Sequence, residues 1–188
     1  MKIMETKLPG VKVIEPKVFS DHRGWFMETF SDEWFIKDGI AIDFVQDNHS
    51  FSATRGTLRG IHYQLNPKAQ AKLVRCTRGA FYDVAVDIRK GSPTFGDWFG
   101  LELSADNRKQ LFIPKGFAHG FITLTDNTEV QYKADAFYDP QCDRGISWND
   151  PAIGIVWPDL LTPILSAKDQ TNPLLAEAEN NFVYGEKR

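Results

Sequence analysis

The chain has 188 residues, of which 42% are hydrophobic, and this size and composition suit one compact domain with a real buried core. Its formal net charge of -3 gives no overall positive field, so nucleic acid and an anionic membrane surface are poor candidates for its main partner. Two cysteines, Cys76 and Cys142, are too few for a disulfide framework, and no apolar run reaches the roughly 18 residues of a membrane span. We therefore expect a single domain over residues 1–188, located in the cytoplasm.

Most of the chain, from Leu8 to Trp157, consists of short β-branched and aromatic runs separated by Gly, Pro, Asn and Asp. This pattern is typical of all-β sandwiches and barrels, and it predicts a jelly roll. A few short helices are expected, mainly C-terminal: one at 32–38, and one from Ser166, which precedes Asp169 by three residues as in a helix cap. The predicted strands lie at 12–19, 25–30, 56–64, 71–77, 80–88, 96–103, 110–113, 119–124 and 129–134.

The strand predicted at 80–88 alternates most clearly. Phe81, Asp83, Ala85 and Asp87 fall on one face because side chains along a strand alternate with a period of two. Two carboxylates therefore point to the same side of this strand.

Residues 114–120 read Pro-Lys-Gly-Phe-Ala-His-Gly and match the second cupin motif, PxGxxH, which delivers His119 onto an inward-facing strand. The first cupin motif supplies His-x-His and then Glu, but this chain has His-Tyr-Gln at 62–64 with Lys72 following. Zinc or iron needs three or more ligands of the His, Cys, Asp or Glu type, and a lysine would repel a cation. The sequence thus predicts a cupin-like fold with no metal site.

The chain carries, in this order, EPKVF at 15–19, DHRG at 21–24, FVQDNHS at 44–50, LRGIHYQ at 58–64, KLVR at 72–75, DVAVD at 83–87, SPTFG at 92–96, IPKGFAHGF at 113–121, WND at 148–150, WP at 157–158 and LSAKD at 165–169. Together these segments closely resemble the dTDP-4-dehydrorhamnose 3,5-epimerase family. The resemblance implies a jelly-roll homodimer that epimerises a dTDP-4-keto-6-deoxyhexose in dTDP-L-rhamnose biosynthesis, for lipopolysaccharide or another cell-surface polysaccharide. No cofactor is implied.

Epimerisation beside a ketone requires a base, a group that holds the enolate oxygen, and an acid on the opposite face. His62 is the candidate base because histidine accepts a proton near neutral pH. The alternative for His62 is a hydrogen-bonded core histidine. Asp169 would orient and charge-balance His62, or would serve the first turn of the C-terminal helix.

Lys72 is expected to point into the barrel with Val74 and Cys76, where an ammonium group needs a carboxylate partner or an anion. Asp83 would neutralise Lys72 in the resting enzyme, and Lys72 would hold the enolate oxygen during turnover. The alternative is a simple buried ion pair.

The resemblance makes Tyr132 the acid, since a phenol can donate a proton and remain hydrogen-bonded as a phenolate. Tyr138 competes for this role, or forms a wall or stacks on the thymine or sugar. Without the family, both tyrosines would be interpreted as core aromatics.

The resemblance also implies substrate contacts. Guanidinium and ammonium groups suit a pyrophosphate, and short polar side chains suit the edges of thymine and deoxyribose. Surface loops are the alternative for all of these residues, and His119 has the alternative of a remnant metal ligand. Residues 23–28 are expected to come from the partner subunit, and Asp143 departs from the family's glutamate. The implied substrate-binding residues are Arg23, Glu28, Gln46, Asp47, Asn48, Arg59, Lys72, Asp83, His119, Tyr138, Asp143 and Lys168.

Three other functions remain open at the level of sequence. The first is epimerisation of only C3 or only C5 of a related nucleotide sugar, with the same base and acid. The second is a metal cupin such as an oxygenase or phosphosugar isomerase, which would need ligands that Gln64 and Lys72 replace. The third is a non-catalytic sugar-binding cupin, which is disfavoured because His62 and Tyr132 are both present.

Overall fold

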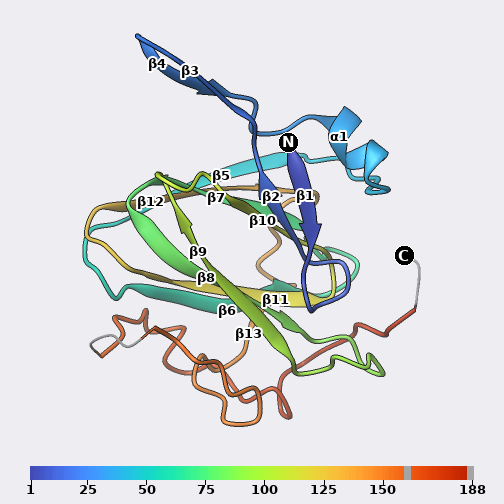
Figure 1. The fold of residues 1–188 in the computed structure, drawn as a ribbon. Helices are drawn as coiled ribbons and strands as arrows, with labels where there is room; N and C mark the ends of the chain where they lie inside the picture. The colour runs from blue at the N-terminus through green and yellow to red at the C-terminus, as the bar shows by residue number, and fades with distance from the viewer. Residues whose placement is uncertain (159–161, 186–188) are drawn as a thin grey trace.

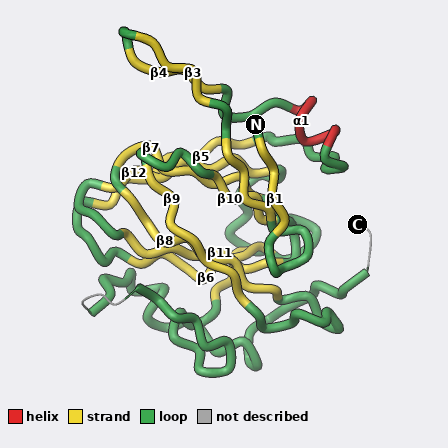
Figure 2. The backbone as a smooth tube through the Cα atoms, viewed as in Figure 1, coloured by secondary structure: helices red, strands yellow, loops and turns green. Residues whose placement is uncertain are grey.

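The computed structural model describes residues 1–158 and 162–185. Two antiparallel sheets pack face to face (Figure 1), and loops and turns make up most of the remainder (Figure 2). The six-stranded sheet has the order β1 (Lys2–Glu5), β2 (Lys12–Glu15), β10 (Gln110–Ile113), β7 (Lys72–Arg78), β12 (Thr128–Ala134) and β5 (Gln46–Ser52). The five-stranded sheet has the order β13 (Asp143–Gly145), β6 (Leu58–Gln64), β11 (Phe117–Thr123), β8 (Ala80–Asp87) and β9 (Trp98–Ser104).

The main core lies between the two sheets. Phe81 and Ala85 of β8 pack there with residues such as Val74 of β7, whereas Val84 and Val86 belong to a second cluster on the outer side of the five-stranded sheet. The alternation predicted for residues 80–88 is therefore confirmed. It leaves Asp83 on the inner face of the sheet, between two buried apolar residues.

The C-terminal segment covers the outer face of the five-stranded sheet, where it runs beside β6 and β13 (Figure 1). Ile153 and Phe182 of this segment pack with Ile61 and Tyr63 of β6 in the second cluster. Because apolar side chains on both faces of β6 are buried, this strand is held firmly. The segment that covers it also carries Asp169.

A smaller cluster covers part of the six-stranded sheet. It is built around α1 (Asp32–Lys37), whose Phe35 packs edge to face against Phe112 of β10 with ring centroids 5.5 Å apart. Such aromatic contacts stabilise a pair beyond the area it buries. The helix predicted at 32–38 is thus confirmed.

A separate hairpin of β3 (Val18–Asp21) and β4 (Gly24–Met27) projects from the sandwich (Figure 1). One continuous strand had been predicted at 12–19, and this prediction is wrong. Pro16 cannot donate a ladder hydrogen bond and restricts the residue before it, so the strand ends at Glu15 and a new one begins at Val18.

The helix predicted from Ser166 is also wrong, and helices are not mainly C-terminal among the described residues. Ser166 does form the local capping contact, because its Oγ accepts a hydrogen bond from the Asp169 backbone N–H at 3.2 Å. The described residues that follow contain no helix; they form turns, bends and an isolated β-bridge at Val183. Pro173 restricts the residue before it, and the few positions between the cap and this proline are too short for a stable helix.

The remaining predicted strands are confirmed with small shifts at their ends. Three strands were not predicted: β1, β5 and β13. Strand β5 reads Gln-Asp-Asn-His-Ser-Phe-Ser, so it lacks the apolar alternation by which strands are recognised. Its inner face carries polar groups because it borders a pocket.

Candidate active site

One pocket of about 430 Å³ opens between the two sheets. Its walls come from both sheets and from the segment that follows residue 161. The walls therefore bring together residues distant in sequence, as jelly-roll sites do. The lining residues are Ser50, Thr57, Leu58, Arg59, His62, Lys72, His119, Phe121, Tyr132, Ile164, Leu165, Ser166 and Asp169.

His62 and Asp169 form a dyad on one wall of this pocket. Nε2 of His62 donates to Oδ1 of Asp169 over 2.5 Å, and the Asp169 side chain is only 4% exposed. Burial raises the pKa of Asp169, but the hydrogen bonds from His62, Ser166 and the Gly60 backbone outweigh burial and lower this pKa below its ordinary value. The contact places the proton of the neutral His62 ring on Nε2 and leaves Nδ1 as its basic nitrogen.

Backbone pairing delivers Asp169 to His62. The Ile164 N–H donates to the Gly56 carbonyl at 2.9 Å, and the Leu58 N–H donates to the Ile164 carbonyl at 2.9 Å. These two bonds attach the C-terminal segment to the start of β6. Asp169 follows five residues after the attachment, where the chain turns back over His62.

Gly60 allows strands β6 and β11 to approach closely beside the dyad. It has a φ of +125°, and a Cβ at this position would lie 2.5 Å from Cα of Gly120. Both the left-handed backbone and the close approach require glycine. The ladder also shifts register between His119 and Phe121, which brings His119 opposite His62.

His119 forms a second, deeper dyad with Asp83. Its Nε2 donates to Oδ1 of Asp83 over 2.6 Å, and both side chains are buried. Burial lowers the pKa of His119 despite the opposing effect of Asp83, so its ring is neutral at pH 7. The other carboxylate oxygen of Asp83, Oδ2, is buried without a hydrogen-bond partner among the described residues.

Lys72 enters the pocket from the opposite sheet, on β7. Burial lowers the pKa of Lys72 to about 8, against the raising effects of Asp83 and Asp143. Within the part of the chain that the structure describes, no carboxylate lies within 4.0 Å of the Lys72 ammonium. The Lys72–Asp83 ion pair expected from the sequence is therefore not formed, because Asp83 pairs with His119 instead.

Tyr132 lines the pocket from β12, on the wall opposite the strand that carries His62. Its ring lies 5.8 Å from Nζ of Lys72. Burial raises the pKa of Tyr132, so the phenol keeps its proton at neutral pH. The side chains of His62, Lys72 and Tyr132 thus face one pocket.

Tyr138 lies outside the lining of this pocket and is 57% exposed. Its hydroxyl donates to Oδ2 of Asp143 at 3.2 Å, and the same oxygen accepts a hydrogen bond from Lys168. The neighbouring Arg144 pairs with Glu179 at 2.6 Å. The predicted contacts Tyr138, Asp143 and Lys168 are therefore brought together, as one polar cluster.

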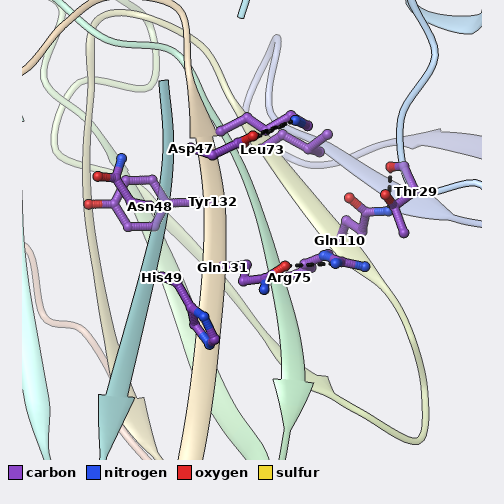
Figure 3. A pocket seen from close by; sticks show the side chains of 10 residues that line it. Thr29, Asp47, Asn48, His49, Leu73, Arg75, Gln110, Gln131 and Tyr132 are labelled. Atoms are coloured by element: carbon purple, nitrogen blue, oxygen red, sulfur yellow. Dashed lines mark hydrogen bonds and ion pairs between the residues drawn. The ribbon is translucent and has the colours of Figure 1, made fainter. Parts of the chain in front are cut away.

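The run at 46–48 divides between the two faces of β5. The Gln46 amide donates to Oδ1 of Asn48 at 3.0 Å on the inner face, whereas Asp47 pairs with Lys133 at 2.9 Å on the outer face. Figure 3 shows Asn48 and Tyr132 pointing to the side of the strands opposite Arg75. A smaller pocket of about 290 Å³ lies on the outer face of the six-stranded sheet, on the side of Arg75, and Asp47 lines it.

Arg23 lies in the turn of the projecting hairpin and Glu28 directly follows β4, and neither lines the pocket between the sheets. The Arg23 guanidinium pairs with Asp21 at 2.6 Å, and its side chain is 79% exposed. Arg59 does line the pocket, where its Nη2 donates to the Phe51 carbonyl at 3.3 Å.

Several lining residues were not predicted, among them Ser50, Thr57, Phe121 and Leu165. For Ser50 a signal existed, because it is two positions beyond Asn48 and so shares its face in a strand. The same signal existed for Phe121, which is two positions beyond His119 on β11. Thr57 and Leu165 lie in the pocket through long-range contacts that the local sequence does not encode.

Comparison with known proteins identifies the family of this chain. The family model described as dTDP-4-dehydrorhamnose 3,5-epimerase matches residues 5–177. The chain belongs to the dTDP-4-dehydrorhamnose 3,5-epimerase family. It is therefore an isomerase of the epimerase type, as the sequence predicted.

A family member from Sinorhizobium fredii (strain NBRC 101917 / NGR234) is 52% identical over 98% of this chain and 94% of its own length. The crystal structure of the enzyme from Bacillus anthracis str. Ames, with TDP and PPi bound, is 51% identical, with a TM-score of 0.89 over 92% of this chain and 98% of that one. That of dTDP-6-deoxy-D-glucose-3,5-epimerase from Legionella pneumophila Philadelphia 1, in complex with dTDP-4-keto-L-rhamnose, is 45% identical, with a TM-score of 0.90 over 94% and 93%. These structural matches confirm the cupin-like β fold.

Two further observations concern the described residues alone. No set of three His, Cys, Asp or Glu side chains there is grouped so that it could hold a metal ion. None of the helices there is long and apolar enough to cross a membrane.

Proposed function

We propose that this epimerase converts dTDP-4-dehydro-6-deoxy-D-glucose into dTDP-4-dehydro-L-rhamnose by inverting C3 and C5, in dTDP-L-rhamnose biosynthesis. The observation that carries the proposal is the His62–Asp169 dyad, which faces Tyr132 across a pocket in a member of this family. A base and an acid on opposite walls are what inversion of a carbon requires.

In each inversion, Nδ1 of His62 removes the proton from the carbon beside the C4 ketone. The C–H electrons form the enolate C=C bond, and the C4 oxygen becomes negative. The imidazolium that results is stabilised by Asp169, whose lowered pKa keeps it ionised. The phenol of Tyr132 then donates its proton to the opposite face of the carbon, the ketone re-forms, and water restores both groups.

Lys72 stabilises the enolate oxygen. Its ammonium is poorly solvated, which its lowered pKa reflects, and no carboxylate among the described residues lies within 4.0 Å to neutralise it. A cation held in a dry pocket acts strongly on charge that develops in the transition state. Oδ2 of Asp83, beside His119, is buried and has no hydrogen-bond partner among the described residues. Asp83 therefore accepts a hydrogen bond from the sugar when the substrate is bound.

The nucleotide binds along the mouth of the pocket. Arg59 and Lys168 supply positive charge for the pyrophosphate, and Gln46 and Asn48 supply amides for the thymine and deoxyribose. Tyr138 and Asp143 complete this rim through their contacts with Lys168. Lys168 must release Asp143 before its ammonium can bind the pyrophosphate, so the substrate displaces Asp143 from Lys168.

The enzyme acts as a homodimer with shared sites. The projecting hairpin exposes Phe19, Trp25 and Phe26 at 52%, 55% and 69%, and a cluster of exposed large apolar residues is typical of an interface. Docked on a second copy, the hairpin supplies Arg23 and Glu28 to the partner's pocket. Asp47, on the outer face of the sheet, contacts the substrate only through a rearrangement of β5.

The proposal extends to a single domain over residues 1–188 that works in the cytoplasm without a metal or another cofactor. NMR of dTDP-4-dehydro-6-deoxy-D-glucose in deuterated water, with chelator-treated enzyme, tests the reaction. Deuterium should enter at both C3 and C5. Exchange at one carbon would replace the proposal with a single-carbon epimerase, and no exchange with nucleotide binding retained would indicate a binding protein.

A further inference from the structure

Gly145 lies directly opposite His62 in the ladder between β13 and β6. Residues opposite each other in an antiparallel pair point to the same face, with Cβ atoms about 5 Å apart. Because Gly145 has no side chain, the position beside the His62 ring is left open by β13 itself.

The side chain of Asn172 occupies that position. A Cβ built on Gly145 would lie 2.4 Å from Oδ1 of Asn172 and 2.5 Å from both Cγ and Nδ2. The amide plane of Asn172 therefore rests on Cα of Gly145. The backbone of Gly145 is not in the left-handed region, so glycine is required here for space and not for conformation.

Asn172 ends the turn that presents Asp169. Within this turn the Gln170 N–H donates to the Ser166 carbonyl at 3.2 Å, and the Thr171 N–H donates to the Lys168 carbonyl at 3.1 Å. Just beyond it, the Pro173 carbonyl accepts a hydrogen bond from the Ser147 N–H at 2.7 Å. The turn is thus fastened to the chain that follows β13, and Asn172 is the side chain that touches β13 itself.

The contact of Asn172 with Gly145 depends on packing and not on a hydrogen bond. Its Nδ2 is buried, yet it has no hydrogen-bond partner among the residues that the structure describes. A buried amide without a partner lowers stability, so hydrogen bonding does not account for this contact. The flat side chain fits where Gly145 leaves room, and the fit fixes the distance between the turn and β13.

We propose that Asn172 is a positioning residue that, seated on Gly145, holds the Asp169 carboxylate against His62. The inference rests on the proposed role of His62 as the base. A rigid contact here matters because the dyad acts only when carboxylate and ring are aligned in the hydrogen-bonding geometry. Neither residue touches the reacting carbon.

The test adds a methyl group at Gly145 and then removes the group with which it collides. Gly145→Ala pushes Asn172 and the Asp169 turn away from His62. It should lower kcat by about 100-fold, a loss that a displacement of ~1 Å can cause, while KM stays unchanged. Asn172→Ala combined with Gly145→Ala should recover most of the lost kcat, because the new methyl group then fills the vacated space.

Gly100→Ala is a matched control. Gly100 lies on β9, at the other edge of the same sheet, and a Cβ there would meet the Tyr82 ring at 2.6 to 2.7 Å. It should lower thermal stability as Gly145→Ala does but leave kcat unchanged. Equal losses of kcat in both variants, or no recovery in the double variant, would overturn the positioning role. His62→Ala, measured in parallel, separates the positioning role of Asn172 from the role of His62 as the base. Full activity in His62→Ala would refute the role of His62 itself.

Discussion

At the scale of single residues, the site contains two histidine–carboxylate contacts, and the two histidine side chains differ in how far they are exposed. The His62 side chain is 30% exposed to the pocket, whereas that of His119 is 8% exposed. A base must reach its substrate, so His62 fits this role better. His119 and Asp83 instead supply a fixed neutral ring and an unpaired carboxylate oxygen beside it.

Removing the charge of Asp169 tests the first contact. Asp169→Asn keeps the shape of the side chain but can no longer stabilise the imidazolium that forms when His62 takes a proton. We expect kcat to fall roughly 10- to 100-fold, the range typical when the partner that fixes a histidine ring is lost. Steady-state kinetics with a coupled reductase measures this effect, and a kcat equal to that of the wild type would contradict it.

The pH dependence of activity tests Lys72. Since the pKa of Lys72 is about 8 and its charged form is the functional one, kcat/KM should fall as pH rises through about 8. Burial raises the pKa of Tyr132 above its ordinary value, so its deprotonation begins at higher pH.

Lys72→Arg is the control for this assignment, because a guanidinium stays charged throughout this range. The fall near pH 8 should be absent in whatever activity the variant retains. A pH profile that still falls near 8 would assign that limb to a different group.

At the scale of elements, sequence patterns predicted strands well where the pattern and the packing agree. Strand β8 alternates because one face enters the main core and the other enters the second cluster. Strand β5 was missed because its inner face borders the pocket and is polar. Strands β6, β7 and β12, which carry His62, Lys72 and Tyr132, were predicted because they keep enough apolar alternation, whereas β5 borders the pocket without it.

In the C-terminal segment, by contrast, a helix was predicted that does not form. Ser166 and Asp169 were predicted to begin a helix, and the capping hydrogen bond does form. Long-range contacts override the local signal, because Asp169 turns to His62 and Asn172 packs on Gly145. The contact of His62 with Asp169, by contrast, could be predicted only through the family resemblance, since 107 positions separate the two residues.

Asp87 anchors the loop between β8 and β9. It accepts hydrogen bonds from Arg89 at 2.6 Å, from Ser92 at 2.6 Å and from Thr94 at 2.7 Å. Burial raises the pKa of Asp87, but these bonds outweigh it and hold the pKa below 3.8. The stabilisation is therefore complete above the unfolded value near 3.8 and is lost as pH falls through the folded value.

Asp87→Asn should lower the free energy of unfolding by about 3–5 kcal/mol at pH 7, since it leaves Arg89 without its buried partner. Urea denaturation measures the difference between wild type and variant. This difference should shrink as the pH falls below about 4. A difference that stays constant down to pH 2 would show that the Asp87 charge is not what stabilises the loop.

At the scale of the whole molecule, the sandwich brings the base and the acid together. His62 comes from the five-stranded sheet and Tyr132 from the six-stranded sheet, so neither sheet alone forms the site. In the proposed homodimer, the projecting hairpin would add Arg23 to the pocket of a second copy. Its isolation from the core was not predicted, because a pattern of strands does not say where a hairpin docks.

Shared sites predict complementation between inactive variants. His62→Ala and Arg23→Ala, each impaired alone, should regain about one quarter of wild-type activity after co-expression, since half of the dimers are mixed and each mixed dimer holds one intact site. The activity of the whole co-expressed dimer population, without separation of the mixed dimers, measures this. If Arg23 served its own chain's pocket, mixing would recover nothing.

In the proposed reaction, His62 removes the protons at both C3 and C5. The most direct measurement follows deuterium entry into dTDP-4-dehydro-6-deoxy-D-glucose by NMR, with His62→Ala beside the wild type and with dTDP binding measured as the control for folding. Exchange is expected at both carbons with the wild type, and at neither carbon with a His62→Ala protein that still binds dTDP. Exchange at wild-type rates in His62→Ala would contradict this role of His62.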